Sequence, residues 1–209
     1  SSPALIKEGS VITHLIKSCV VGADIDPDLM IAGDRNALMI SIRMTGYGPN
    51  YPYKATCVQC KHRGEYSASL DRLGIKRLEI KPIEEGRNEF VYELPVTKKQ
   101  IKFKFLTEAD DKNKKATEKF MSSHTNGKVE NKITSFLENS IVEIDGIRDK
   151  NKIKHFVMHM PAFDSKALRK FINKNEPGID MSQKFECIEC DHVNETKLPV
   201  NSEFFWPST

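Results

Sequence analysis

No run of apolar residues in this chain approaches the roughly 20 positions that a membrane-spanning helix requires. Charge of one sign is also missing, because 32 lysines and arginines face 29 aspartates and glutamates and leave a net charge of +3. Such a balance gives no global argument for binding nucleic acid or acidic lipid. The first residues lack the charged and then apolar layout of a signal peptide. We therefore expect a cytoplasmic protein without membrane contacts, in a compartment where thiols stay reduced.

Patterns for catalysis and nucleotide binding are missing too. His155 and His159 have the i, i+4 spacing of a zinc-protease helix, but Phe156 stands where that motif needs its general-base glutamate. Exposed helix histidines are therefore the better interpretation. The segment Gly46-Tyr47-Gly48 matches neither glycine-rich nucleotide motif. We predict that the protein is not an enzyme and has no small-molecule substrate.

The periodicity of apolar residues predicts an α+β fold. A hydrophobic fraction of 39% suffices for a core, and 209 residues fit one domain with a sizeable insertion. Helical spacing follows Asp34, a candidate N-cap, and recurs near residues 129–140, 149–160 and 165–173. Alternation predicts strands at residues 53–58, 65–70, 78–83, 90–94 and 101–106, the last two as a hairpin. Further strand texture brackets residues 187–190.

A lysine-rich segment occupies residues 98–132. It holds ten lysines and five acidic residues, and Thr107 with Asp110 resembles a capping box that opens a polar helix through about Phe120. A solvated helix face is the first interpretation of this surplus. Contact with an acidic partner protein comes second. Nucleic acid comes third, because aromatic side chains that could stack on bases are scarce there.

Four of the five cysteines form two CxxC pairs, Cys57/Cys60 and Cys187/Cys190. Two intervening residues allow both sulfurs of a pair to reach one metal at about 2.3 Å, and two such pairs complete a tetrahedral site with no open position. We therefore expect one structural Zn²⁺. The fifth cysteine, Cys19, stands in an apolar context and is expected in the core.

The distance between the pairs is the difficulty, because 126 residues separate Cys60 from Cys187. Closing so long a loop costs on the order of 4–5 kcal/mol, whereas structural zinc in finger peptides yields roughly 10–16 kcal/mol. The alternatives are a site completed between two subunits, a chance occurrence of the two pairs, or a redox dithiol, for which the required βαβ setting is missing. His62 and His192, two residues past each pair, are expected in turn or supporting positions rather than as ligands.

The chain ends on consecutive aromatic residues, Phe204, Phe205 and Trp206. They exceed what one strand face or helix stripe can bury. Two interpretations stand side by side: the aromatics fill the protein's own core, or they dock into a neighbouring protein, where aromatic side chains dominate interface energetics.

Two further groups of residues flank the cysteine pairs. The first, within residues 29–75, comprises Gly33-Asp34-Arg35, Ile42-Arg43, Thr45-Gly46-Tyr47-Gly48 and Tyr51. The second, within residues 184–207, joins CxxC-x-His to Leu198-Pro199-Val200 and Glu203-Phe204-Phe205-Trp206-Pro207. With these motifs in this order, the sequence resembles the T4-type phage baseplate proteins, and its length is similar to that of their hub subunit. Lys61 and Asp191 depart from the glycine that knuckles often carry, which leaves the turn geometry open.

The resemblance implies a non-enzymatic protein of a contractile phage tail that takes part in building the baseplate hub through contacts with other hub and tail proteins. It would act in the host cytoplasm during assembly, and its permanence in the virion stays open. The expected layout of the single domain 1–209 is a helical part at 1–50, zinc-ribbon-like halves at 51–75 and 184–209, and an insertion at 76–183. The alternative function is a zinc-ribbon nucleic-acid-binding protein.

Overall fold

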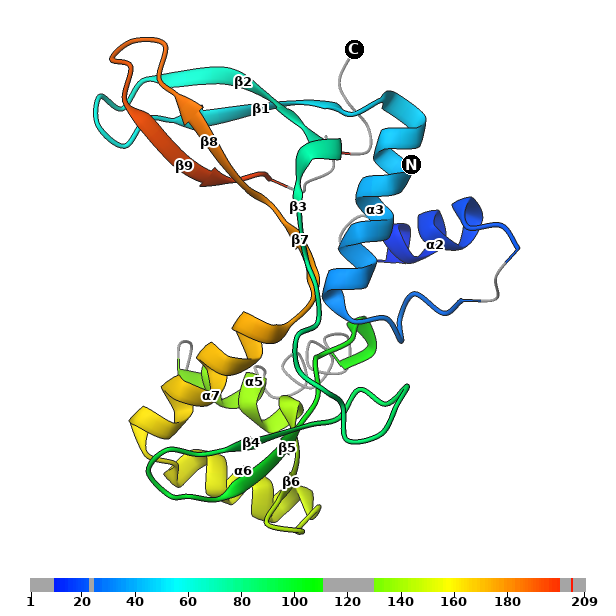
Figure 1. Cartoon of the computed structure of the whole chain (residues 1–209), viewed down its shortest axis with the longest axis vertical. Helices are drawn as coiled ribbons and strands as arrows, with labels where there is room; N and C mark the ends of the chain where they lie inside the picture. The colour runs from blue at the N-terminus through cyan, green and yellow to red at the C-terminus, as the bar shows by residue number, and fades with distance from the viewer. Residues whose placement is uncertain (1–9, 23–24, 111–129, 200–203, 205–209) are drawn as a thin grey trace, which may run out of the picture. The chain divides into compact units, whose positions relative to one another are not determined.

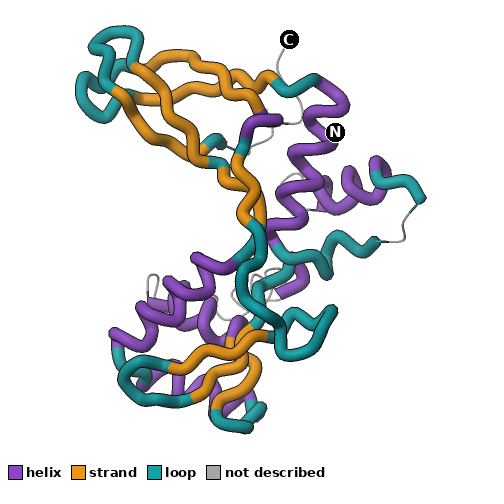
Figure 2. The backbone as a smooth tube through the Cα atoms, in the orientation of Figure 1, coloured by secondary structure: helices purple, strands orange, loops and turns teal. Residues whose placement is uncertain are grey.

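The computed structural model describes residues 10–22, 25–110, 130–199 and 204 (Figure 1). The chain divides into two compact units, each with its own hydrophobic core. Unit 1 comprises Ser1–Pro27, Gly33–Lys76 and Gly178–Thr209, and unit 2 comprises Asp28–Ala32 and Arg77–Pro177. Both units mix helices and short antiparallel sheets, so the fold class is α+β (Figure 2). Among the described residues, no helix combines the length and apolarity needed to cross a membrane.

In its described residues, unit 1 contains two α-helices, one short 3-10 helix and three strand pairs, formed by segments from both ends of the chain. In chain order its elements are α2 (Ser10–Cys19), α3 (Ala32–Tyr47), β1 (Asn50–Thr56), β2 (Arg63–Ser69), η1 (Leu70–Arg72), β3 (Gly74–Lys76), β7 (Gly178–Asp180), β8 (Ser182–Glu186) and β9 (Val193–Lys197). β1 pairs with β2 and β8 with β9 as antiparallel hairpins. The short pair β3–β7 joins the two halves, with Ile75 opposite Ile179. The larger segment of unit 2, Arg77–Pro177, is therefore inserted between two strands that are hydrogen-bonded to each other.

A close backbone approach explains the glycine that opens β7. A Cβ on Gly178 would lie 3.0 Å from the Cα of Gly33, and the φ angle of Gly178 is +158°. Only a residue without a side chain lets these two backbones meet at this distance.

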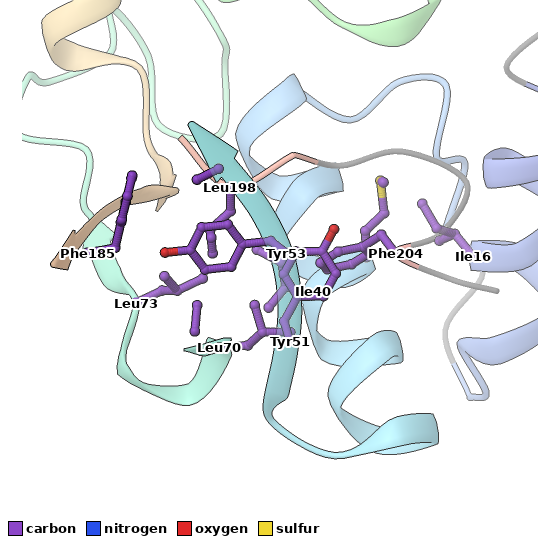
Figure 3. Close-up of a cluster of buried hydrophobic side chains, with 12 residues drawn as sticks. Ile16, Ile40, Tyr51, Tyr53, Leu70, Leu73, Phe185, Leu198 and Phe204 are labelled. Carbon is purple, nitrogen blue, oxygen red and sulfur yellow. The ribbon is translucent and has the colours of Figure 1, made fainter. Parts of the chain in front are cut away.

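The core of unit 1 collects side chains from both helices and both hairpins (Figure 3). Alternate residues of β1 face inward, as its strict exposed–buried pattern requires. Phe204 is fully buried in this core, and its ring meets that of Tyr51 edge-on at 4.9 Å. The Tyr51 hydroxyl donates to the Pro199 carbonyl at 2.7 Å. For Phe204, the structure thus selects the first of the two interpretations, whereas Phe205 and Trp206 lie outside the described residues.

Unit 2 is a three-stranded antiparallel sheet with helices. The sheet has the order β4-β5-β6, built from β4 (Phe90–Glu93), β5 (Gln100–Phe103) and β6 (Ile141–Ile144). The helices are α5 (Glu130–Ser140), α6 (Lys150–His159) and α7 (Ala162–Asn175). The inner face of α7 packs on the sheet: the ring of Phe171 lies 4.4 Å from that of Tyr92 and 5.9 Å from that of Phe103. At the start of α7, buried Asp164 accepts a hydrogen bond from the Val96 amide at 2.8 Å.

Several local predictions are confirmed. The hairpin β4–β5 forms as the alternation indicates. Asp149 caps α6 by accepting from the Lys152 amide at 2.8 Å. Thr107 and Asp110 form the reciprocal capping box, with Thr107 N donating to Asp110 Oδ2 at 3.0 Å and Asp110 N donating back to Thr107 Oγ1 at 3.4 Å. The rest of that predicted helix lies outside the described residues.

Three predictions are wrong. Asp34 does not cap its helix, because α3 begins at Ala32 and contains Asp34 in its first turn. Residues 78–83 form no strand, although their polarity alternates. Alternation produces a strand only where a partner takes up the backbone groups; none of the described strands pairs with this segment, and Pro82 removes one donor. Cys19 is exposed rather than buried, because it ends α2 beyond Ile16, the last buried residue of that helix.

Candidate metal centre

The two CxxC segments are the loops of the β1–β2 and β8–β9 hairpins, which lie at the same end of unit 1 (Figure 1). They have the same backbone geometry. In the first, Cys57 N donates to the His62 carbonyl at 2.9 Å and Lys61 N donates to the Cys57 carbonyl at 3.1 Å. In the second, the equivalent bonds are 3.0 Å and 2.9 Å long. Each loop is thus a knuckle that turns its cysteine side chains toward one point.

Lys61 and Asp191 occupy the turn positions at which knuckles often have glycine. Both adopt the left-handed conformation, with φ of +64° and +55°. Aspartate tolerates this region better than most residues, whereas lysine is strained there by about 1 kcal/mol. The knuckle geometry is therefore kept without glycine.

The four sulfur atoms lie within 4.8 Å of one another. Across the two knuckles, Cys57 Sγ is 3.7 Å from Cys190 Sγ, and Cys60 Sγ is 3.5 Å from Cys187 Sγ. A tetrahedron with metal–sulfur bonds of about 2.3 Å needs sulfur–sulfur distances of about 3.8 Å. The cysteines are free thiols rather than disulfides, and their spacing fits a tetrahedral metal ion of the size of zinc.

The environment of the thiols differs within each knuckle. Cys57 and Cys187, the first cysteines, are fully buried, whereas Cys60 is exposed and Cys190 is half-buried. Burial raises the pKa of Cys57, but hydrogen bonds from the amides of Cys60 and Gln59 and from Asn194 outweigh it and lower the pKa to about 6. Amide donors therefore favour the thiolate, the form that binds metal.

Cys190 shows the opposite balance. A backbone hydrogen bond at His192 lowers its pKa, but burial and the other three thiols of the cluster raise it to about 12. The pKa of Cys60 is also raised. Four adjacent thiols resist joint ionisation because their negative charges repel. A bound cation removes this repulsion.

The sequence did not indicate Asn194, which links the two knuckles. Its side chain is buried; Oδ1 accepts from the Val58 amide at 2.9 Å, and Nδ2 lies 3.5 Å from Cys57 Sγ and 2.8 Å from the His192 carbonyl. From its position on β9, Asn194 therefore supports the knuckle of the other hairpin, β1–β2. Such supporting groups orient ligands and modulate metal affinity.

The first hairpin has a different residue at the position equivalent to Asn194. Gly64 occupies in β2 the position that Asn194 occupies in β9, seven residues after the first cysteine. A Cβ on Gly64 would lie 2.9 Å from the hydroxyl of Tyr66. That hydroxyl is buried, and burial together with the adjacent Cys187 raises the pKa of Tyr66. Gly64 thus makes room for Tyr66 beside the buried Cys187.

Neither pair of candidate histidines belongs to the cluster as ligands. His62 and His192 contribute their carbonyls to the knuckles, and the His62 ring is 3.9 Å from Glu189. His155 and His159 are exposed on α6 in unit 2, with their rings stacked at 4.3 Å. They behave as the helix histidines that the sequence predicts.

Four sulfur ligands leave no position for a substrate or a nucleophilic water, so the arrangement suits a structural ion rather than a catalytic one. Fold and site together define a class: an α+β protein in which two matching cysteine knuckles from distant segments converge on one metal-sized cluster. The model of the family described as T4 bacteriophage base plate protein matches residues 5–206. The chain belongs to this family.

No curated protein and no solved structure matches the chain. Membership in the family, which confirms the resemblance seen in the sequence, supports a structural role in a phage baseplate and contacts with other baseplate or tail proteins.

Proposed function

We propose that the protein is a non-enzymatic structural or assembly subunit of the baseplate hub in a contractile phage tail. The observation that carries this proposal is the family match over almost the whole chain, from residue 5 to residue 206. The similarity in length to a hub subunit supports the assignment to the hub. The protein would meet its partners in the host cytoplasm during assembly, and the family match supports a place in the phage tail.

The proposed role of the cysteine cluster is to hold one Zn²⁺ through Cys57, Cys60, Cys187 and Cys190. Sulfur–sulfur distances of 3.5 and 3.7 Å support this ligand set. The ion would join two hairpins that are each only two strands wide, and an isolated two-stranded hairpin is marginally stable in water. Zinc would therefore stabilise the ends of the two hairpins relative to the unfolded chain.

The lysine-rich segment gives little support to the alternative, a nucleic-acid-binding protein. In its described part, Lys99 pairs with Asp145, Lys102 with Glu143 and Lys104 with Asp110, each at 2.7 Å. Lysines neutralised in this way are poor phosphate ligands. Protein–protein contact is accordingly the proposed mode of action.

Co-expression tests the function. The chain is produced together with the tail proteins encoded beside it, and complexes are isolated by affinity purification and size-exclusion chromatography. We expect it to co-purify with at least one hub protein. A chain that stays monomeric and unbound in every combination would contradict the proposal, and binding to DNA that falls steeply with salt would favour the alternative.

A further inference from the structure

The outer face of α7 carries positive charge that nothing in the described structure neutralises. Lys166, Lys170 and Lys174 follow one another at i, i+4 spacing and are all exposed. Among the described residues, no carboxylate lies within ion-pair distance of any of them. Elsewhere in unit 2, lysines of the sheet and its flanking segments are paired with carboxylates at 2.7 Å. Other exposed cations of unit 2, such as Lys150 and Lys152 on α6, also have no ion pair among the described residues, but α7 carries three of them on one face at i, i+4 spacing.

An apolar side chain extends the same stripe. Phe163, one helical turn before Lys166, is 63% exposed. At 1.5 Å per residue the stripe from Phe163 to Lys174 is about 16 Å long, with a cation every 6 Å or so. The opposite side of the helix is committed to the core through Leu168 and Ile172, both almost fully buried. The outer stripe is thus held on a rigid, well-packed element.

Stability does not explain this pattern. Like charges at i, i+4 destabilise a helix slightly, and alternating signs would stabilise it. A large exposed aromatic side chain beside them also favours a contact over plain solvation. The residues fit a role in binding an anionic partner that supplies both charge and an apolar pocket.

We infer that this α7 stripe (Phe163, Lys166, Lys170 and Lys174) docks an acidic helix of a neighbouring baseplate protein, an inference that rests on the proposed function in assembly. An acidic helix with carboxylates four residues apart repeats the same spacing of about 6 Å. Phe163 anchors one end of the contact in an apolar pocket, while the lysines form a charged rim that accelerates and orients association.

The charge distribution favours a protein over nucleic acid. Residues 150–175, which contain α6 and α7, carry seven lysines and arginines and one carboxylate, a surplus of six. Because the whole chain is +3, the remainder is net −3. Proteins that bind duplex DNA commonly make more phosphate contacts than the three lysines of this stripe can supply. An acidic protein surface of limited extent matches the stripe alone.

The test compares variants in co-purification with the neighbouring tail proteins. Lys170→Glu creates favourable pairs with both flanking lysines while lowering the stripe charge from +3 to +1. We expect an unchanged or higher melting temperature, with association roughly tenfold slower at about 0.15 M salt. The triple variant K166E/K170E/K174E, and separately Phe163→Ala, should lose the partner. The matched control reverses three exposed cations elsewhere, R77E/K81E/K184E, and should retain it.

The outcomes separate this inference from the proposed function. A photo-crosslinking residue at position 170 should capture an acidic segment of the partner. Wild-type partner binding by the triple variant, or equal loss in the control, would overturn the inference and leave the hub assignment intact. Retardation of short duplex DNA that depends on these lysines would assign the stripe to nucleic acid and overturn it as well. If no tail protein binds the wild-type chain, both fall.

Discussion

Replacing Cys187 by serine should loosen the knuckle of the opposite hairpin. Cys60 and Cys187 are 127 positions apart, so a metal that joins them closes a loop of that length in the unfolded chain. Chain-entropy scaling for a cross-link of this length gives about 5 kcal/mol. If the β3–β7 pair forms first, the loop that remains between Cys60 and Cys187 shrinks to about 27 residues and the stabilisation to about 3.5 kcal/mol.

This loss should be confined to unit 1, because the core of unit 2 contains none of the four cysteines. For a unit of this size, it corresponds to a fall of roughly 15–30 °C in the unfolding midpoint. Differential scanning calorimetry would follow both units, and hydrogen exchange would report the β1–β2 amides directly. A strong chelator should reproduce the effect in the wild-type chain and change nothing in the variant.

Cys19→Ser is the matched control, since Cys19 is exposed and far from the cluster in sequence. It should unfold like the wild type. If Cys187→Ser had the same midpoint as this control, or if β1–β2 kept its protection, the two knuckles would not share an ion.

Three further predictions concern single residues. Asn194→Ala removes the hydrogen bond to the first knuckle and should weaken metal affinity about 10–100-fold in a chelator competition, with the fold retained; an unchanged affinity would reduce Asn194 to a packing residue. Gly64→Ala places a methyl group against the Tyr66 hydroxyl and should lower the free energy of unfolding by about 1–3 kcal/mol. Tyr66→Phe should restore part of this loss. If the effects of the two substitutions on stability were additive, the two residues would not be in contact. Lys102 and Arg148 hold the pKa of Glu143 below its ordinary value of 4.5. The resulting stabilisation of the folded state is complete above about pH 4.5 and is lost as the pH falls through the lowered pKa. Glu143→Gln should therefore reduce the fall of the melting temperature at acid pH.

The cysteine cluster could be anticipated because its chemistry is local. Two residues between thiols suffice to define a knuckle, and the same six-residue pattern occurs twice. The supporting residues could not be found in this way. Asn194 acts on Val58, 136 positions away, and asparagine in a strand has no signature of its own. The difference between Asn194 and Gly64 becomes evident only when equivalent positions of the two hairpins are compared.

The fold was predictable where periodicity coincided with a cap or a turn. Asp149 marks the start of α6, and the hairpin β4–β5 follows from two alternating runs. The strand pair β3–β7 was missed because three-residue strands carry too little pattern. Residues 78–83 show the reverse error, since a strand pattern without a partner stays irregular. The α7 lysines look like an ordinary solvated face until the exposed Phe163 is seen to lie on the same side of the helix.

Native mass spectrometry of the purified protein tests the central claim most directly. One chain with two knuckles around a common centre should carry the mass of one zinc ion, and Cys187→Ser should lose that ion entirely rather than keep a second one at the intact pair. Two zinc ions per wild-type chain would mean that each knuckle binds separately. A chain without metal after purification free of chelators would contradict the shared site altogether.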